Sequence, residues 1–162
     1  MYNSLNTSKV YKFQKLQVKM MKDIKRLATQ FRNAIDAAKD DRIFFRETIF
    51  REFPRGCCGI ASELLAQFLL ESGIRTYYIC GNYREGSFDN FQSHAWLETE
   101  DNIIIDITGD QFRYNPAFLN YNKPIYVGLM DDFHNLFEID FGRSDVCYHG
   151  KPDLYQKIMR YI

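Results

Sequence analysis

The sequence of 162 residues lacks several features that define common classes of protein. It has no run of about 18 apolar residues, which excludes a membrane-spanning helix. Residues 1–15 contain neither an apolar core nor a small-residue cleavage site, so no secretory signal is expected. No glycine-rich phosphate-binding motif of either common kind occurs, so nucleotide binding has no sequence support. Only four cysteines are present, and we expect them to be reduced thiols in a cytoplasmic protein.

Metal-ligating residues are also scarce. The chain has three histidines, and no two cysteines have the spacing of two to four residues that structural zinc sites use. Cys80, His134, Cys147 and His149 are the residues that come closest to a zinc set, and their spacing does not fit one. We therefore expect no metal and no other cofactor.

Apolar and aromatic residues, in contrast, are abundant. Hydrophobic residues make up 46% of the chain and aromatic residues 16%, which predicts a packed core rather than disorder. The length predicts a single domain over residues 1–162 that buries roughly 70% of its unfolded surface. Within it we expect a helical N-terminal extension over residues 1–52 and a core over residues 53–130.

The net charge is zero, but the two ends of the chain differ in sign. Residues 1–32 carry eight basic residues and one acidic residue, a net charge of +7, whereas the rest carries 13 basic and 20 acidic residues, a net charge of −7. We interpret this as a basic helix face that docks near an acidic body. The alternative is a surface for an anionic partner, such as a membrane surface, nucleic acid or an acidic protein; an acidic partner fits the basic helix, and nucleic acid is not expected.

Hydrophobic periodicity predicts four helices, over residues 13–38, 41–52, 58–72 and 152–162. The first is long enough for a coiled coil, although we prefer a helix that lies across the core. Pro54 and Gly56 break the second, and Gly73 provides a left-handed C-terminal cap for the third.

Runs rich in β-branched and aromatic residues predict strands over residues 76–80, 93–99, 103–108 and 124–129, with a polar loop over residues 82–92. The order of these elements predicts an α+β domain in which a helix packs on a mostly antiparallel sheet.

The stretch GCCGIAS, residues 56–62, places a thiol at the start of a predicted helix. The unpaired amides and the dipole of a helix N-terminus stabilise a thiolate and can donate to an oxyanion. Cys58 is the candidate nucleophile, and Cys57, one residue earlier, should face the interior or Arg55. A cysteine at such a position can equally be an apolar filler, so further residues must decide.

His94 in SHAWLE and Asp106 in IIDITGDQF supply the remaining chemistry. If the two strands form a hairpin with an odd loop centred on Glu100, these residues are direct cross-strand neighbours with Cβ atoms about 5 Å apart. Such a carboxylate orients an imidazole and stabilises its charged form. An even loop would turn Asp106 to the opposite face. The alternatives are a buried, hydrogen-bonded histidine and an acid sheltered by Thr108.

Three neighbours complete the candidate site. Trp96 follows His94 on the same strand face, where it either packs under the site or lines the substrate. Asp110 and Gln111 follow Asp106 and serve either as further hydrogen-bonding groups of the site or as caps of the turn.

Together these motifs resemble the core of the transglutaminase-like, papain-like cysteine enzyme superfamily, in a bacterial-type form. The runs G-x-C-G-x-A-S, H-A-W-L-E and I-D-I-T occur in the family's order over residues 53–112. The resemblance implies a papain-like or transglutaminase-like fold, with Cys58 as nucleophile, His94 as base and Asp106 as the orienting carboxylate.

The resemblance also implies attack on an amide carbonyl and a thioester intermediate. We expect a hydrolase with a protein or peptide substrate, either a protease or isopeptidase or a glutamine deamidase. Acyl transfer to an amine, as in transglutaminases, is an alternative. The other is a non-catalytic binding module that uses the basic N-terminal helix.

Overall fold

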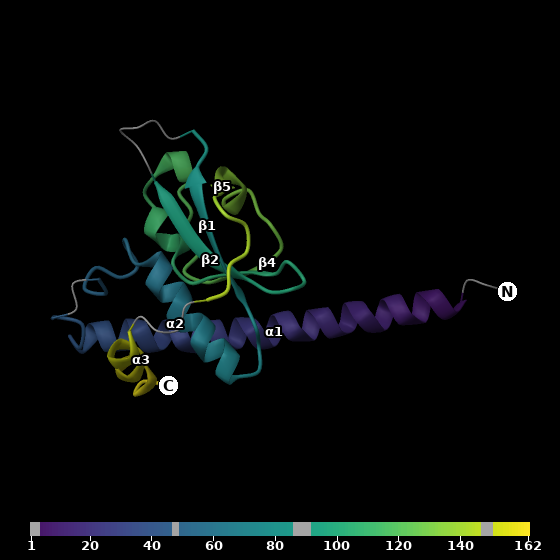
Figure 1. Cartoon of the computed structure of the whole chain (residues 1–162), viewed down its shortest axis with the longest axis horizontal. Helices are drawn as coiled ribbons and strands as arrows, with labels where there is room; N and C mark the ends of the chain where they lie inside the picture. Colours follow the sequence, from purple (N-terminus) through teal and green to yellow (C-terminus); the bar gives the residue numbers. More distant parts are fainter. Residues whose placement is uncertain (1–3, 47–48, 86–91, 147–150) are drawn as a thin grey trace.

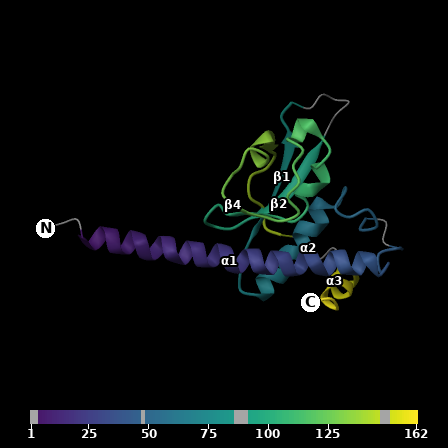
Figure 2. The same cartoon turned by 180° about the vertical axis from the view of Figure 1, so that it is seen from behind.

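The computed structural model describes residues 4–46, 49–85, 92–146 and 151–162, and these residues have an α+β architecture. They contain the three α-helices α1 (Ser4–Asp40), α2 (Cys58–Glu71) and α3 (Pro152–Met159), together with a five-stranded sheet. Helix α1 runs along the base of the molecule, and its N-terminal half extends well beyond the body that the other elements form (Figures 1 and 2).

Helix α1 confirms the first predicted helix and exceeds it at both ends. Its C-terminal half is buried along one stripe at steps of three and four residues, which comprises Ile24, Leu27, Ala28, Phe31, Ala34, Ile35 and Ala38. Toward the N-terminus the same helix leaves the core, and Leu16 and Val18 are 58% and 54% exposed. The helix therefore lies across the core with one half only.

The predicted helix over residues 41–52 is wrong, because its described residues form turns. Arg42 adopts a left-handed conformation with φ of 58°, and the amide of Ile43 bonds back to Ala38, so α1 cannot continue. The following aromatic residues pack on one another instead: the rings of Phe44 and Phe50 are 5.4 Å apart, and those of Phe50 and Phe53 are 5.5 Å apart. The apolar residues that we predicted to form one face of a helix are therefore buried from turns, where three phenylalanines pack together.

Helix α2 matches the predicted helix to within a residue. Gly73 has φ of 79°, and the amides of Gly73 and Ile74 bond to the carbonyls of Leu70 and Leu69, which closes the helix as expected. The helix begins at Cys58, after Gly56 has turned the chain with φ of 66°. Its buried face packs against α1 and the sheet.

The sheet is antiparallel, with strand order β4-β3-β2-β1-β5. Its strands are β1 (Tyr77–Tyr83), β2 (Ser93–Glu98), β3 (Ile104–Asp106), β4 (Tyr126–Gly128) and β5 (Phe137–Ile139). The four predicted strands are all present with shifted ends, and β1 continues into the range predicted as a loop. Strand β5 was not predicted, because three residues between turns give too short a pattern.

The two faces of the sheet support two separate cores. Leu97 and Ile105 face the helices; α1 and α2 cover that side, and α3 packs on α1. The other face carries an aromatic cluster, which comprises Ile79, Trp96, Ile104, Phe112, Phe118, Tyr121, Phe133 and Phe137. Residues of the sheet beyond position 130 therefore belong to the same packed unit as residues 53–130.

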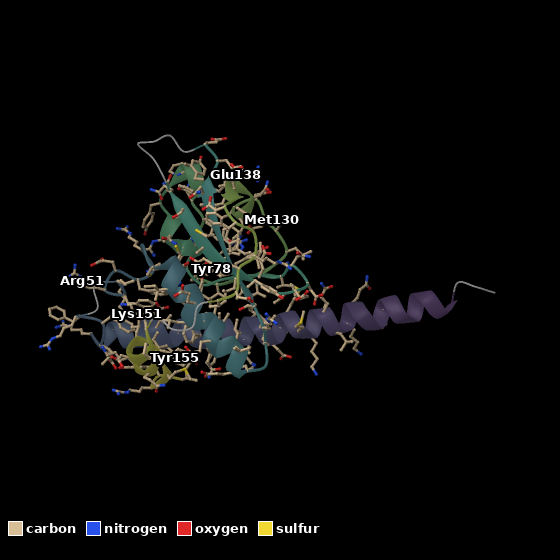
Figure 3. All side chains as sticks on the ribbon, viewed as in Figure 1. Arg51, Tyr78, Met130, Glu138, Lys151 and Tyr155 are labelled. Atoms are coloured by element: carbon tan, nitrogen blue, oxygen red, sulfur yellow. The ribbon has the colours of Figure 1, made fainter. Side chains whose placement is uncertain are left out.

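Helix α3 begins at Pro152, as predicted, and ends at Met159. Its Tyr155 lies beside α1, where its ring is 6.4 Å from Phe31 and its hydroxyl donates to Glu71 at 2.7 Å (Figure 3). None of the helices in the described part of the chain combines the length and apolarity that crossing a bilayer requires.

Candidate active site

The thiol of Cys58 lies at the start of α2, in the first turn of the helix. The N-cap residue, Cys57, makes no capping hydrogen bond with its side chain, and the backbone amides of a first helical turn have no acceptor within the helix. The next residue is small for a steric reason: a Cβ at Gly59 would lie 3.0 Å from the hydroxyl of Tyr78, which sits where α2 meets the sheet (Figure 3). The local sequence thus leaves a half-buried thiol beside free amides.

The adjacent thiol of Cys57 is in a different environment. Its side chain is buried, and the sulfur donates to the carbonyl oxygen of Pro54 at 3.2 Å. Burial, together with the nearby Cys58, raises the pKa of Cys57 to about 12. Cys57 therefore faces the interior, as predicted, and stays protonated at neutral pH.

His94 is held on β2 with no exposed surface. Its direct neighbour on β1 is Gly81, where a Cβ would come within 2.9 Å of the Cβ of Phe137. The missing side chain lets Phe137 approach, and its ring centre lies 5.5 Å from that of His94. The imidazole is thereby fixed in an aromatic shell, with Trp96 at 5.8 Å and Phe112 at 5.3 Å.

Asp106, at the end of β3, is the carboxylate that contacts His94. Its Oδ2 lies 2.9 Å from the Nε2 of His94, and both side chains are almost fully buried. The other oxygen, Oδ1, accepts from the backbone amide of Thr108 at 2.8 Å and from its hydroxyl at 3.1 Å. A Cβ at Gly109 would lie 2.8 Å from Oδ2, so the residue after Thr108 must be small.

The predicted register of this hairpin is wrong by two residues. Leu97 pairs with Ile105 and Glu98 with Ile104, so the loop is centred on Asp101 rather than Glu100. The loop is still odd, and this register places Asp106 opposite Trp96 on the same face as His94. The two side chains therefore meet along a diagonal of the sheet instead of directly across it.

The thiol of Cys58 lies near the imidazole of His94, and each group shifts the pKa of the other. Burial alone would raise the pKa of Cys58, but the nearby His94 and its charge, with the backbone amide of Ala95, outweigh it and lower the pKa below the ordinary range. Burial would likewise lower the pKa of His94, whereas the charge and hydrogen bond of Asp106 and the nearby Cys58 raise it to about 9. The geometry favours a thiolate–imidazolium pair.

The Asp106 carboxylate is the third charged group, next to the His94 imidazolium and the Cys58 thiolate. Burial disfavours its ionised form, but the charge of His94, the nearby His134 and the hydrogen bond with His94 hold the pKa of the carboxyl well below its usual range. The carboxylate is therefore negative throughout the neutral pH range.

A cleft of about 560 Å³ gives access to the thiol. Arg55 and Gly56 line one part of it, and its remaining wall comes from Gln92, Ser93, Gln111, Phe112, Tyr114 and Asn115. Arg55 is the one charged side chain among these lining residues. The amide side chains offer both donors and acceptors, which is what a peptide group requires.

Gln111 reaches from the cleft to His94. Its Nε2 lies 3.3 Å from the Nδ1 of His94 and donates to the carbonyl of Thr108 at 3.1 Å, while its Oε1 accepts from the amide of Gly56 at 3.4 Å. The side chain therefore links the turn after β3 to the turn before α2. It lies among the groups of the site, beside the ring nitrogen of His94 that Asp106 does not contact.

Asp110 lies elsewhere. Its carboxylate makes two hydrogen bonds with the guanidinium of Arg32 on α1, at 2.9 and 3.0 Å, and both side chains are buried. Arg32 also donates to the carbonyls of Ile107 and Pro124, at 2.7 and 3.2 Å. Asp110 thus fastens α1 to the end of the sheet and has no described contact with His94.

Trp96 is fully buried and packs against His94, so the structure places it under the imidazole rather than on the cleft wall. Its indole nitrogen lies 3.4 Å from the Glu98 carboxylate. Cys147 and His149, which the zinc alternative required, lie outside the described residues.

His134 was not predicted as part of the site. It lies in the short 3₁₀ helix η4 (His134–Leu136), between β4 and β5, and its Nε2 is 3.4 Å from the Oδ2 of Asp106. No local pattern predicts this contact, since 28 positions separate the two residues and no strand pattern joins them. Only the folded sheet brings them together.

His94, Asp106 and His134 are also the described residues that bring three potential metal-binding atoms together, all within 4.8 Å of one another. The 2.9 Å separation of the His94 nitrogen and the Asp106 oxygen is that of a hydrogen bond. All three side chains are buried, and the other ring nitrogen of His94, Nδ1, lies 3.3 Å from the Nε2 of Gln111. We interpret the cluster as a chain of hydrogen-bonded and ion-paired groups.

Comparison with known proteins gives no match: neither a protein-family model, nor a curated protein, nor a solved structure is similar to this chain.

Proposed function

We propose that this chain is a cysteine-dependent amide hydrolase in which Cys58 is the nucleophile, His94 the acid and base, and Asp106 the orienting carboxylate. The observation that carries the proposal is the continuous contact from a thiol at an open cleft, through a buried imidazole, to a buried carboxylate. Nucleophilic catalysis requires these three chemical groups in this order.

In the first half of the reaction, the Cys58 thiolate attacks the carbonyl carbon of a substrate amide and forms a carbon–sulfur bond. The carbonyl oxygen becomes an oxyanion, which the free amides at the start of α2 face as donors. The amide of Gln111 is a further donor at the cleft. His94 then gives the proton on Nδ1 to the leaving nitrogen, the carbon–nitrogen bond breaks, and a thioester on Cys58 remains.

In the second half, a water molecule enters the cleft and His94, now neutral, removes its proton. The water oxygen attacks the thioester carbon, the carbon–sulfur bond breaks, and a carboxylic acid leaves. The thiolate–imidazolium pair is restored, so no redox agent or cofactor is needed. An amine in place of water would give acyl transfer instead.

A protein or peptide substrate suits the cleft. Gln92, Gln111 and Asn115 can satisfy both the N–H and the C=O groups of an extended backbone, and Phe112 and Tyr114 add apolar contact area. Peptide cleavage, glutamine deamidation and acyl transfer share the thioester, so the products distinguish them.

The experiment incubates the purified chain with a defined peptide library that contains glutamine and lysine side chains, with the Cys58→Ala variant as control. Peptide cleavage adds about 18 Da in total across two products, deamidation adds about 1 Da, and transamidation by lysine removes about 17 Da. We expect one of the first two, in wild type only. A change that the Cys58→Ala variant produces equally would contradict the proposal.

A second candidate function, binding through the exposed part of α1, is favoured by one observation. This part of the helix exposes the apolar Leu16 and Val18 beside Lys15, Lys19 and Lys22. An acidic protein segment with apolar anchors would complement such a surface. Replacing the three lysines with glutamate should abolish binding of a fluorescent poly-L-glutamate probe in low salt. Unchanged binding would exclude this role.

A further inference from the structure

The Asp106 carboxylate has a second imidazole neighbour, on the side away from Cys58. Oδ2 lies 2.9 Å from the Nε2 of His94 and 3.4 Å from the Nε2 of His134. The side chain of His134 is fully buried, and its Nε2 makes no regular hydrogen bond within the described part of the chain. A buried ring nitrogen is thus directed at a carboxylate that His94 already occupies.

The other ring nitrogen of His134 is firmly held. Its Nδ1 lies 2.6 Å from the Oδ1 of Asp131, and the same oxygen accepts from the backbone amide of His134 at 3.0 Å. Asp131 in turn accepts from the hydroxyl of Tyr121 at 3.1 Å and lies 3.6 Å from the ammonium of Lys123. This arrangement fixes the His134 ring and directs Nε2 at Asp106.

Both nitrogens of His134 therefore face carboxylate oxygens. A neutral imidazole has one N–H group, so one of these two contacts would set a lone pair against a negative oxygen. The imidazolium form satisfies both contacts, because each nitrogen then carries a proton. The groups that face His134 are Asp106 and His94 from the sheet, Asp131 from its own turn, and the phenols of Tyr121 and Tyr126.

We propose that His134 is a positioning residue that supplies a permanent positive charge to Asp106, so that the carboxylate stays ionised and in place when His94 gives its proton away. The inference rests on the proposed function, since only a reacting His94 changes its charge. A buried carboxylate without a cation is costly, and during thioester formation the neutral His94 no longer provides one. His134, held in its charged form by Asp131, provides this cation through the whole cycle.

A consequence follows for the proton on His94. With His134 positive, Asp106 is shared between two cations, and its hold on the His94 proton is weaker than in an exclusive pair. His94 can therefore release the proton to a leaving amine. Without the charge on His134, Asp106 would bind the His94 imidazolium more strongly, and the pKa of His94 would rise.

The experiment is NMR titration of the full chain labelled at histidine. The chain has three histidines, so single replacements assign the ring signals. In the wild type, we expect the His94 ring to titrate at a pKa of about 9 and the His134 ring to remain charged at pH 7. The variant His134→Gln should raise the pKa of His94 by at least about 0.5, a threefold gain in proton affinity.

Two further variants separate charge from packing. Asp131→Asn keeps the imidazole but removes the anion that holds its second proton, so it should also raise the pKa of His94. Tyr126→Phe changes a ring that lies 5.1 Å from His134 without changing a charge beside Asp106, and it should leave the pKa of His94 unchanged. Asp131 is partly exposed, so its replacement is compatible with folding even if His134→Gln is not.

Some results would overturn the role of His134 and leave the proposed function of the chain unaffected. If Cys58 is an acidic thiol in the wild type but neither variant moves the pKa of His94, or if His134 is neutral at pH 7, the role of His134 is wrong and the triad stands. Stoichiometric zinc in the purified protein would also overturn it. If His94 titrates near 6.5 and Cys58 reacts as an ordinary thiol, the proposed function itself fails.

Discussion

Asp106 and Asp110 are two buried carboxylates four residues apart, and they have different partners in the structure. Their substitution should therefore have different effects. Asp106 contacts His94 at 2.9 Å, whereas Asp110 binds Arg32. Replacing each with asparagine removes one negative charge from the same turn region. We expect Asp106→Asn to abolish the acidity of the Cys58 thiol and Asp110→Asn to lower the stability of the fold.

The size of the first effect follows from the thiolate population. An ordinary thiol with a pKa of about 8.5 is about 0.3% thiolate at pH 6, whereas a thiol paired with a charged imidazole is mostly thiolate. Loss of the pair therefore lowers the thiolate fraction of Cys58 by roughly 10²-fold. A less acidic thiol forms a more nucleophilic thiolate, and this raises the rate again by about 10-fold. We expect Asp106→Asn to slow the reaction with iodoacetamide at pH 6 by about 10-fold.

The second effect follows from the buried ion pair. Removing one partner of such a pair costs about 3–5 kcal/mol, and we expect the lower end, because Arg32 keeps Asp36 at 2.9 Å and two backbone carbonyls. For a chain of this length, about 3 kcal/mol lowers the Tm by about 6–12 °C. The thiol of Cys58 should keep its reactivity in Asp110→Asn.

Both variants are assayed for the rate of Cys58 alkylation at pH 6 and for Tm by calorimetry, with the rate measured well below the lower Tm. Equal loss of thiol reactivity in the two variants would refute the assignment of Asp106 as the orienting carboxylate. So would a rate in Asp106→Asn within about twofold of wild type.

Three other outcomes are expected. Cys57→Ala should keep the reactivity of Cys58 and cost about 1 kcal/mol in the free energy of unfolding, because Cys57 is a buried filler; loss of thiol reactivity in this variant would shift the nucleophile by one residue. In a Cys58→Ala background, the raised pKa of His94 gives stability that is complete below about pH 6.5 and is lost as the pH rises, while the lowered pKa of Asp106 gives stability that is lost as the pH falls below about 4. The Tm should therefore pass through a plateau near pH 5–6, and a Tm that keeps rising above pH 7 would contradict this. Deleting residues 1–19 should change the Tm by less than about 2 °C, because the described side chains there are largely exposed, whereas Ile24→Ala should cost about 2–5 kcal/mol; a large loss from the deletion would show that this segment is buried in solution.

Helix α2 and strand β2 could be predicted from sequence because their signals are local. The leucine-rich helix α2 is followed by Gly73, whose left-handed conformation depends on that residue alone, and SHAWLE is an apolar run of strand length that is buried on both faces. The helix predicted over residues 41–52 is wrong for the opposite reason. Apolar spacing there fits a helix, but the packing of Phe44, Phe50 and Phe53 on one another decides the backbone, and packing is not a local property.

In the candidate site, too, the residues on elements with local patterns could be predicted, and the contacts between distant elements could not. Cys58, His94 and Asp106 lie on elements with clear patterns, so their proximity in the fold could be predicted. The predicted pairing of the two strands differs from the observed pairing by two residues. The partner of Asp110 is 78 positions away on α1, and His134 reaches Asp106 across β4. Contacts of this kind depend on the order of the strands, which no short stretch of sequence contains.

The central claim, that Cys58 is an activated nucleophile, is tested most directly by mapping alkylation by iodoacetamide to single cysteines between pH 4 and 10. We predict that Cys58 reacts first, that its rate has a midpoint well below pH 8, and that Cys57 does not react below pH 9 in the folded chain. A Cys58 rate that rises only with a midpoint near pH 8.5, or faster labelling of another cysteine at pH 6, would contradict it.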